Sequence, residues 1–259
     1  MMKRLLIASA ALLPAWTAAA AADDGEGKRV RVGLGAQIRP EWYGADKSEI
    51  GPYWSFDLAS GDEEFSFEAP DDGFDIKLIK SDGFSAGPVA NLSMSRKNKD
   101  VGANVGKVPM TIEAGVFADY FLSDSFRMRG ELRKGIGGHE GLVGDVGADF
   151  VSRDGDNYVF SVGPRLLFSN GRYQRELFGV DQAAATATGL PLYRPDGGLH
   201  AIAATSGLSY QFNSQFGLFG YARYERLVGD AGRSPIIRTY GSRNQASAGI
   251  GLSYTFKVD

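Results

Sequence analysis

Polar and apolar residues alternate with period two along several stretches of the chain. In residues 246–256, alanine, isoleucine, leucine and aromatic residues form one face, and serine, glycine and threonine form the other. Residues 126–135, FRMRGELRKG, place an arginine or glutamate at every second position, between apolar residues and glycine. Successive side chains of an extended strand point to opposite faces. The alternation therefore predicts an all-β protein.

Alternating strands fit two architectures, a soluble sandwich or barrel with its apolar face inward and an outer-membrane barrel with that face in lipid. The connections distinguish them, because short turns such as SDG, SDS and RDGD alternate with long segments such as 170–198. Short turns at one end and long loops at the other are typical of barrels inserted from the periplasm. We therefore predict an up-and-down antiparallel transmembrane β-barrel with long extracellular loops.

The coarse pattern gives about 12 strands, and 10 remain possible because the third and fourth carry several charges. The predicted strands are residues 30–39, 51–59, 63–69, 74–80, 84–96, 108–122, 125–136, 142–152, 157–169, 199–212, 215–227 and 246–257. Within the longest loop, the stretch GVDQAAATATG favours a short helix over the barrel mouth. Four aromatic residues near the ends of the first two strands fit either the membrane interface or loop packing: Trp42, Tyr43, Tyr53 and Trp54.

The N-terminus has the layout of a secretory signal peptide. Lys3 and Arg4 precede an apolar run and then a series of alanines that offers cleavage sites near residues 20–22. We predict a leader over residues 1–22 and the barrel over residues 23–259. Its removal leaves 26 basic and 31 acidic residues, a net charge of about −5, which disfavours a nucleic-acid partner. The chain contains no cysteine, so disulfides do not stabilise it.

If the apolar faces contact lipid, the charged faces line the lumen. The strand with Arg127 to Arg133 then lies between two strands with acidic residues, and cross-strand pairs can brace the barrel. Two interpretations stay open, a braced interior and a narrow polar pore. The predicted lumen-lining residues are Glu113, Asp119, Arg127, Arg129, Glu131, Arg133, Asp145, Asp149, Arg165, Arg223 and Glu225.

Signals for catalysis are weak. The two histidines, His139 and His200, have no flanking nucleophile or metal-ligand spacing. The best candidate for a catalytic histidine–serine pair on the barrel wall is His200 with Ser206 or Ser209. The DGDN stretch at 154–157 lacks the glutamate of a calcium loop, and the acidic PDDG stretch at 70–73 is interpreted as a solvated turn. We predict no catalytic, cofactor-binding or metal-binding residue, and therefore a protein that is not an enzyme.

Four segments resemble a known family. The stretch GLGAQIRPEWYGADKSEIGPYWSFDL (33–58) resembles the opening strand pair of the MipA/OmpV outer-membrane proteins, named for interaction with the lytic transglycosylase MltA. GFSAGP (83–88) and YQRELFGVDQAAATATGLPLYRPDGGL (173–199) match further landmarks. The most specific stretch is YERLVGDAGRSPIIRTYGSRNQASAGIGLSYTF (224–256).

The resemblance implies a location in the bacterial outer membrane, in contact with its lipid and lipopolysaccharide. It also implies a non-enzymatic scaffold linked to murein remodelling, with a lytic transglycosylase and a murein synthase as partners. The alternative function is a small-solute channel with a charged, porin-like lumen. A scaffold contacts its partners through periplasmic turns, whereas a channel depends on the lumen residues.

Overall fold

The structure is a computed structural model that describes residues 27–258, so the predicted leader lies outside the described residues. Its strands form one antiparallel sheet in the order β2-β1-β12-β11-β10-β9-β8-β7-β6-β5-β3, with β4 also beside β5. The strands are β1 (Lys28–Pro40), β2 (Ser48–Ser60), β3 (Phe74–Asp75), β4 (Ile79–Ser81), β5 (Phe84–Ser93), β6 (Thr111–Ser123), β7 (Phe126–Ile136), β8 (Leu142–Asp154), β9 (Tyr158–Ser169), β10 (Gly198–Gln211), β11 (Phe216–Leu227) and β12 (Asn244–Val258).

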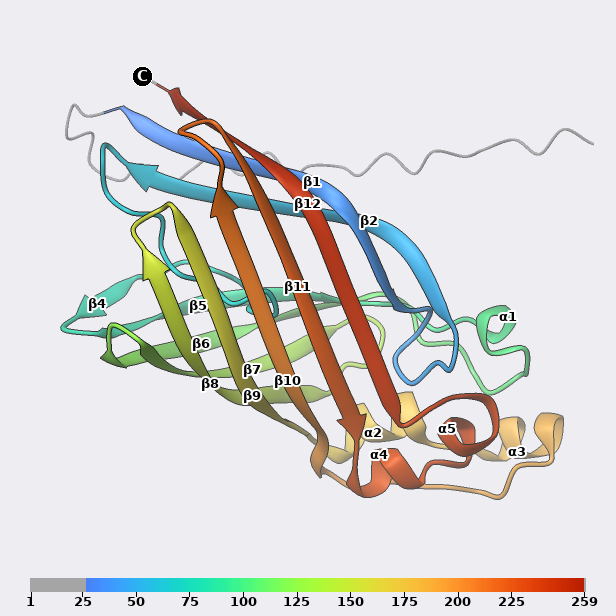
Figure 1. The fold of residues 1–259 in the computed structure, drawn as a ribbon. Helices are drawn as coiled ribbons and strands as arrows, with labels where there is room; N and C mark the ends of the chain where they lie inside the picture. Colours follow the sequence, from blue (N-terminus) through green and yellow to red (C-terminus); the bar gives the residue numbers. More distant parts are fainter. Residues whose placement is uncertain (1–26, 259) are drawn as a thin grey trace, which may run out of the picture.

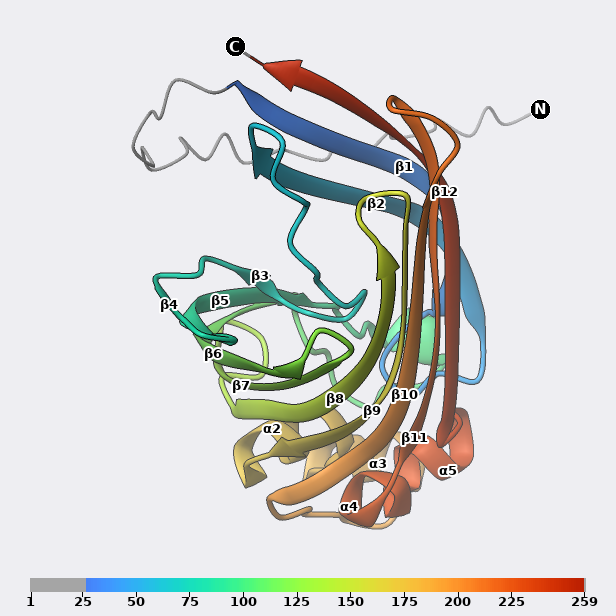
Figure 2. The same ribbon diagram turned by 60° about the vertical axis from the view of Figure 1, so that its left-hand side comes forward.

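This order confirms the predicted up-and-down antiparallel topology. From β5 to β12 each strand pairs with the next one in the chain, and β12 then pairs with β1, beside β2. The sheet curls strongly on itself, as Figures 1 and 2 show. Short connections gather at the end where β12 finishes, and the long loops gather at the opposite end (Figure 1). We call these the turn end and the loop end.

Burial alternates along the strands because the two faces of the curled sheet have different surroundings. In β7, the side chains of Phe126, Met128 and Leu132 are exposed on the outer face, whereas those of Arg127 and Arg129 are buried on the inner face. The same pattern runs through the other long strands. An apolar outer face and a charged inner face are the reverse of a soluble barrel, and they suit a barrel surrounded by lipid.

The prediction of a strand at 63–69 is wrong. Residues 61–73, here called the inner segment, leave the end of β2 and pass within the curl of the sheet before β3 begins (Figure 2). Phe67 and Ala69 pack against Val151 of the wall. Two carboxylates of the inner segment bind arginines that project from the inner face, and this attraction explains why the segment lies inside.

The predicted strand at 74–80 is present in two parts. β3 and β4 both pair with β5, and the residues between them continue the ladder: Ile76 N–H donates to Pro88 O and Leu78 N–H donates to Ala86 O. Within residues 27–258, no hydrogen-bonded ladder joins β2 to β3. We call this opening in the wall the seam.

The long loops fold into a compact layer at the loop end, here called the lid. It contains the helices α1 (Asn98–Val101), α2 (Gly171–Phe178), α3 (Gln182–Thr188), α4 (Gly229–Arg233) and α5 (Pro235–Tyr240) (Figure 1). α3 confirms the helix predicted in GVDQAAATATG. Asp181 caps it by accepting a hydrogen bond from Ala184 N–H, and Gly189 ends it at φ 74°.

An apolar cluster holds the lid together. Phe178, Ile236 and Ile237, from two separate loops, are almost completely buried, together with Trp42 from the loop between β1 and β2. Of the two interpretations of Trp42, loop packing is therefore correct. Among the four aromatic residues considered for the interface, Trp54 is more than half exposed on the outer face. Apolar burial thus makes the loops a structured cover.

Among residues 27–258, none of the helices combines the length and the apolar character that crossing a bilayer requires.

Candidate functional site

The inner face brings the predicted charged residues together in one network. Nine of the eleven are buried, and Asp145 and Arg223 are half-buried. The strand register explains the arrangement, because Asp119 lies opposite Arg129 on β6 and β7, and Asp149 lies opposite Arg127 on β8 and β7. The predicted placement of a basic strand between two acidic ones is confirmed by this pairing.

The three arginines of β7 each contact several carboxylates. Arg127 Nη2 lies 2.7 Å from Asp149 Oδ2, and Arg129 Nη1 lies 3.0 Å from Asp119 Oδ2. Arg133 Nε lies 3.0 Å from Glu113 Oε2. Arg133 also contacts Asp145 at 3.0 Å and pairs with Glu131. A guanidinium has five N–H donors in a planar fork, so one arginine can join carboxylates from two neighbouring strands.

Two further arginines bind the inner segment. Arg165 of β9 donates two hydrogen bonds to the Asp71 carboxylate, Nε to Oδ2 at 3.1 Å and Nη2 to Oδ1 at 3.0 Å. Arg223 of β11 also pairs with Asp71, and the Thr205 hydroxyl donates to the same carboxylate at 2.9 Å. Arg223 Nη2 in turn lies 2.7 Å from Glu225 Oε2. Asp71 therefore links three strands of the wall through one carboxylate.

The sequence prediction missed three acidic members of this network, Asp71, Asp72 and Asp75. Asp72 contacts Arg127 and Arg129, and Asp75 Oδ2 lies 2.8 Å from Arg129 Nη2. The interpretation of PDDG as a solvated turn is wrong, because Asp72 has only 5% of its side chain exposed. No local signal identifies Asp71 and Asp72, since Pro-Asp-Asp-Gly is also the composition of an ordinary exposed turn.

Each of the five arginines described above contacts at least two carboxylates. Burying an ion pair removes both charges from water, so it stabilises little by itself, but removing one partner leaves an uncompensated buried charge. The network therefore fixes which strands and which inner segment belong together more than it adds net stability.

A second polar group lies under the lid. His139, in the loop after β7, is fully buried, and its Nε2 lies 3.1 Å from Glu113 Oε1. Its Nδ1 accepts from Gly141 N–H at 3.0 Å, so Nε2 carries the proton and donates to the carboxylate. The histidine thus joins the loop after β7 to β6.

Two tyrosines extend this group. The Tyr43 hydroxyl donates to Glu225 Oε1, and the Tyr173 ring packs edge-on against His139 with centroids 4.7 Å apart. Burial, and next the nearby Glu225 carboxylate, hold the pKa of Tyr43 well above its usual value. Burial raises the pKa of Tyr173 in the same way. Both phenols stay protonated, so Tyr43 remains a hydrogen-bond donor to Glu225.

The candidate histidine–serine pair does not assemble. His200 is fully buried on the inner side between Tyr43 and Tyr173. Ser206 is on the outer face of β10 and points away from His200. Ser209 lies nine residues after His200 on the same strand, which is roughly 30 Å from it at about 3.3 Å per residue. A nucleophile and its base must lie within hydrogen-bond reach.

Within residues 27–258, no group of three or more histidine, aspartate or glutamate side chains is arranged to bind a metal ion. The DGDN stretch is a turn between β8 and β9, closed by Asn157 N–H donating to Asp154 O at 2.9 Å. Asp156 in that turn pairs with Arg29 at 3.0 Å. Its charge is used to join the turn to β1.

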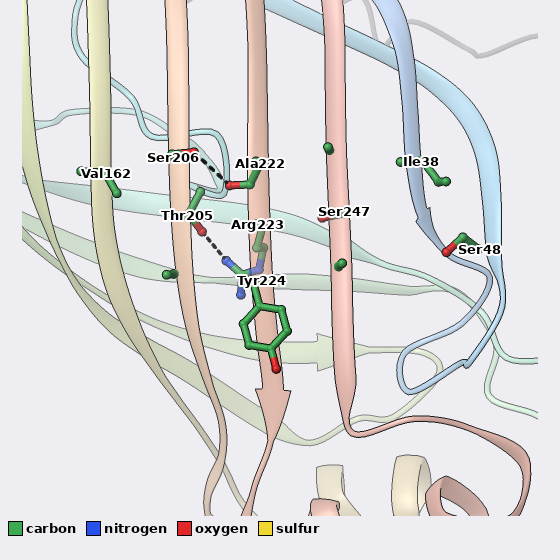
Figure 3. A pocket seen from close by; sticks show the side chains of 12 residues that line it. Ile38, Ser48, Val162, Thr205, Ser206, Ala222, Arg223, Tyr224 and Ser247 are labelled. Atoms are coloured by element: carbon green, nitrogen blue, oxygen red, sulfur yellow. Dashed lines mark hydrogen bonds between the residues drawn. The ribbon is translucent and has the colours of Figure 1, made fainter.

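A shallow hollow of about 490 Å³ lies on the outer surface of the wall and extends from β9 to β2. Small outward side chains, including Ala222, Ala246 and Ala248, form its floor, and Ile38 and Tyr224 stand beside it (Figure 3). The Thr205 hydroxyl meets the Arg223 guanidinium on the other face of the same strands, where Thr205 and Arg223 belong to the ion network. The hollow is therefore a feature of the apolar outer face and is separate from the charged interior.

A curled up-and-down antiparallel sheet, apolar outside and charged inside, defines an outer-membrane β-barrel protein. Residues 32–256 match the family model described as MltA-interacting protein MipA. The chain belongs to the MipA family, as the sequence resemblance indicated, and the protein is located in the bacterial outer membrane.

Several solved structures are similar to this chain. An outer-membrane channel from Pseudomonas putida F1 is 10% identical, with 92% of this chain and 100% of that chain covered and a TM-score of 0.42. The translocator domain of the autotransporter NalP from Neisseria meningitidis is 16% identical, covers 89% of this chain and 88% of that chain, and gives 0.40. The N-terminal β-barrel domain of OprF from Pseudomonas aeruginosa is 13% identical, with coverages of 68% and 100% and a TM-score of 0.29. No curated protein matches the sequence.

Proposed function

We propose that this protein is a non-enzymatic scaffold of the outer membrane that holds murein-remodelling enzymes, a lytic transglycosylase and a murein synthase, through its periplasmic turns. The observation that carries the proposal is the filled interior. The inner segment binds the arginines of the wall, and the lid has its own apolar core. A barrel with a filled interior and a structured lid suits a membrane anchor, and the family name adds the class of partner.

The turn end is the surface that such enzymes would reach from the periplasm. Its turns expose acidic residues, among them Asp82 between β4 and β5 and Asp124 between β6 and β7. Exposed charges at the rim of an interface govern association rate and choice of partner more than affinity. We therefore propose that these turns contribute to partner selection.

A pull-down with a matched control tests the scaffold. The tagged protein is purified from outer membranes in mild detergent and mixed with a purified lytic transglycosylase and a purified murein synthase from the same cells. We expect retention of at least one enzyme by the natural protein and by Asp46→Lys at the loop end, and weaker retention by Asp82→Lys/Asp124→Lys at the turn end. If neither enzyme is retained by the natural protein, the scaffold proposal is wrong.

A small-solute channel is the second candidate, and the five interior arginines favour it. Charged lumen walls set the ion selectivity of narrow pores. The test is conductance in a planar bilayer, first with the natural protein and then with Arg127, Arg129 and Arg133 replaced by glutamate. A channel is expected to show discrete steps and a shift of selectivity toward cations; a bilayer that stays silent with heat-modifiable, folded protein excludes this function.

We also propose outer-membrane lipid and lipopolysaccharide as partners of the wall. Large apolar side chains cover the outer face in the middle of the strands, for example Leu34, Leu132 and Leu252. Arg226 and Lys134 are exposed near the loop end, where phosphate groups of the outer leaflet would lie. Lipid analysis of the purified protein, with and without Arg226→Gln/Lys134→Gln, measures whether co-purified lipopolysaccharide decreases.

A further inference from the structure

The seam leaves two strand edges without a partner strand. β2 runs from the loop end to the turn end, antiparallel to β1, and the stretch from β3 to β4 runs in the same direction before the turn at 82–83. In an up-and-down barrel the two edges therefore need one strand of opposite direction between them. The outward side chains of Phe56 and Leu78 are exposed and apolar, so both edges lie at the depth of the bilayer. Open sheet edges do not persist in hydrocarbon, because unpaired backbone groups find no water there.

The inner segment connects these two edges and already contains both turns that such a strand needs. Glu63 N–H donates to Ser60 O at 3.0 Å, and Gly61 has a φ of 50°, which closes a tight turn directly after β2. Asp72 N–H donates to Ala69 O at 3.0 Å, and the Asp72 carboxylate accepts from Ala69 N–H at 2.7 Å. Residues 63–69 thus lie between two formed turns.

The first turn fixes the register that residues 63–69 would have beside β2. With Ser60 opposite Glu63, Phe65 falls opposite Leu58, Phe67 opposite Phe56 and Ala69 opposite Trp54. The three β2 residues are exposed on the outer face. One apolar face of the segment would therefore meet lipid, and Glu64, Ser66 and Glu68 would point inward.

The second turn gives a register beside β3 that has the same orientation. With Ala69 opposite Asp72, as their hydrogen bond sets, Phe67 falls opposite Phe74 and Phe65 opposite Ile76, and these two partners are also exposed on the outer face. The seven residues 63–69 reach roughly 23 Å along the strand at about 3.3 Å per residue. With the strand tilt of about 35–45° they would cross about two thirds of the apolar band of about 25 Å. Both registers therefore place the same residues outward.

We propose that residues 63–69 are a two-position element of this barrel. In the observed position they lie in the lumen, held by Asp71 on Arg165 and Arg223 and by Asp72 on Arg127 and Arg129. In the second position they form a strand between β2 and β3 and close the part of the seam next to the turn end. The Trp54 and Phe74 rings are now stacked across the seam with centroids 5.4 Å apart, and the inserted strand would separate them, with Trp54 opposite Ala69 and Phe74 opposite Phe67.

The interior tolerates this exchange because no arginine loses its last acidic partner. Without the inner segment, Arg165 keeps Asp149, Arg223 keeps Glu225, and Arg127 keeps Asp119 and Asp149. The departing aspartates join the tip of a Pro-Asp-Asp-Gly turn, a composition that suits a hairpin end. The exchange empties part of the lumen and leaves Arg165 and Arg223 accessible to small anions.

Pairs of introduced cysteines distinguish the two positions, because the natural chain has no cysteine. Pro70→Cys/Gly207→Cys reports the lumen position, since a Cβ at Gly207 would lie 2.7 Å from Pro70 Cγ. Phe56→Cys/Phe67→Cys reports the wall position. Phe56→Cys/Glu68→Cys is the matched control, because residue 68 would face the other side of the same strand.

Oxidation of the folded protein in outer-membrane vesicles is followed by gel mobility, with the boiling shift as evidence of a folded barrel. We expect a disulfide for the lumen pair and for the wall pair, and little for the control. Adding Asp71→Asn/Asp72→Asn should raise the wall disulfide at least threefold and lower the lumen disulfide. The proposal is overturned if the wall pair stays reduced in both backgrounds while the lumen pair oxidises fully, or if the control oxidises as readily as the wall pair.

Discussion

The Arg127 guanidinium holds the Asp72 carboxylate with two parallel hydrogen bonds, Nη1 to Oδ2 at 2.6 Å and Nη2 to Oδ1 at 3.1 Å. The arginine is on β7 and the aspartate is on the inner segment, 55 residues earlier in the chain. Neither side chain is appreciably exposed. This pair therefore joins the wall of the barrel to the segment that fills it.

Arg127→Ala is expected to lower the free energy of unfolding by about 3–5 kcal/mol, because it leaves buried carboxylates without their cation. Adding Asp72→Asn should restore part of the loss, since one of those carboxylates is then neutral. Urea unfolding in lipid vesicles, followed by tryptophan fluorescence, measures both. Arg172→Ala is the control: its pair with Glu140 is about half exposed, and a loss below about 1 kcal/mol is expected.

Tyr43→Phe removes the partly buried donor of Glu225 and should cost about 1.5–3 kcal/mol, the range for a hydrogen bond to a charged group. The effect should concentrate at the loop between β1 and β2, where protease cleavage is expected to become faster. Tyr210→Phe, on the exposed outer face, should leave the cleavage rate unchanged. Equal cleavage of the natural protein and Tyr43→Phe would show that this hydrogen bond does not hold the loop.

We expect the lid to lose stability in acid because of the contacts of Asp230. Its carboxylate accepts from Asp196 N–H at 2.9 Å and pairs with Arg233, and these contacts lower the pKa of Asp230, the backbone N–H most. A depressed pKa contributes stability that is complete above the unfolded value of about 3.9 and is lost as the pH falls through the folded value. Cleavage of residues 190–197 by an acid-active protease should therefore be constant from pH 7 to about 5 and rise below about pH 4. The Asp230→Asn variant should be cleaved faster than the natural protein at neutral pH, and its cleavage rate should lose most of this pH dependence.

Leu132→Arg tests the orientation of the wall. Leu132 is exposed on the outer face, inside the apolar band, and an arginine at mid-bilayer depth costs about 2–4 kcal/mol. Ile136→Arg, at the loop end of the same strand, should cost about 0–1 kcal/mol because it reaches the interface. Unfolding in vesicles compares the two variants; similar costs would contradict the proposed depth of β7 in the membrane.

Most of the wall could be predicted from local pattern. The alternation in β7, from Phe126 to Arg133, fixes which side chains share a face, and the short turns fix which strands are neighbours. These are properties of residues a few positions apart, so one sequence is sufficient to read them. The lid was harder to predict, because the contacts of Trp42 with distant loops depend on how those loops fold.

The prediction of a strand at 63–69 failed for a related reason. Phe65, Phe67 and Ala69 alternate with polar residues as a membrane strand does, and the sequence does not show that distant arginines will compete for the following aspartates. The burial of His139 was missed in the same way, since its partner Glu113 lies 26 residues earlier. In both cases long-range electrostatic contacts override a local pattern.

The local sequence pattern is enough to predict an antiparallel wall with one apolar and one charged face, because side-chain period and turn length depend on neighbouring residues. What fills the space inside that wall depends on the three-dimensional fold. The buried guanidinium groups of Arg127 and Arg165 need carboxylate partners because little water reaches them. The curl of the sheet brings Asp72 within hydrogen-bond reach of Arg127 and Asp71 within reach of Arg165. A contact that depends on closing the curl has no signature in the order of neighbouring residues.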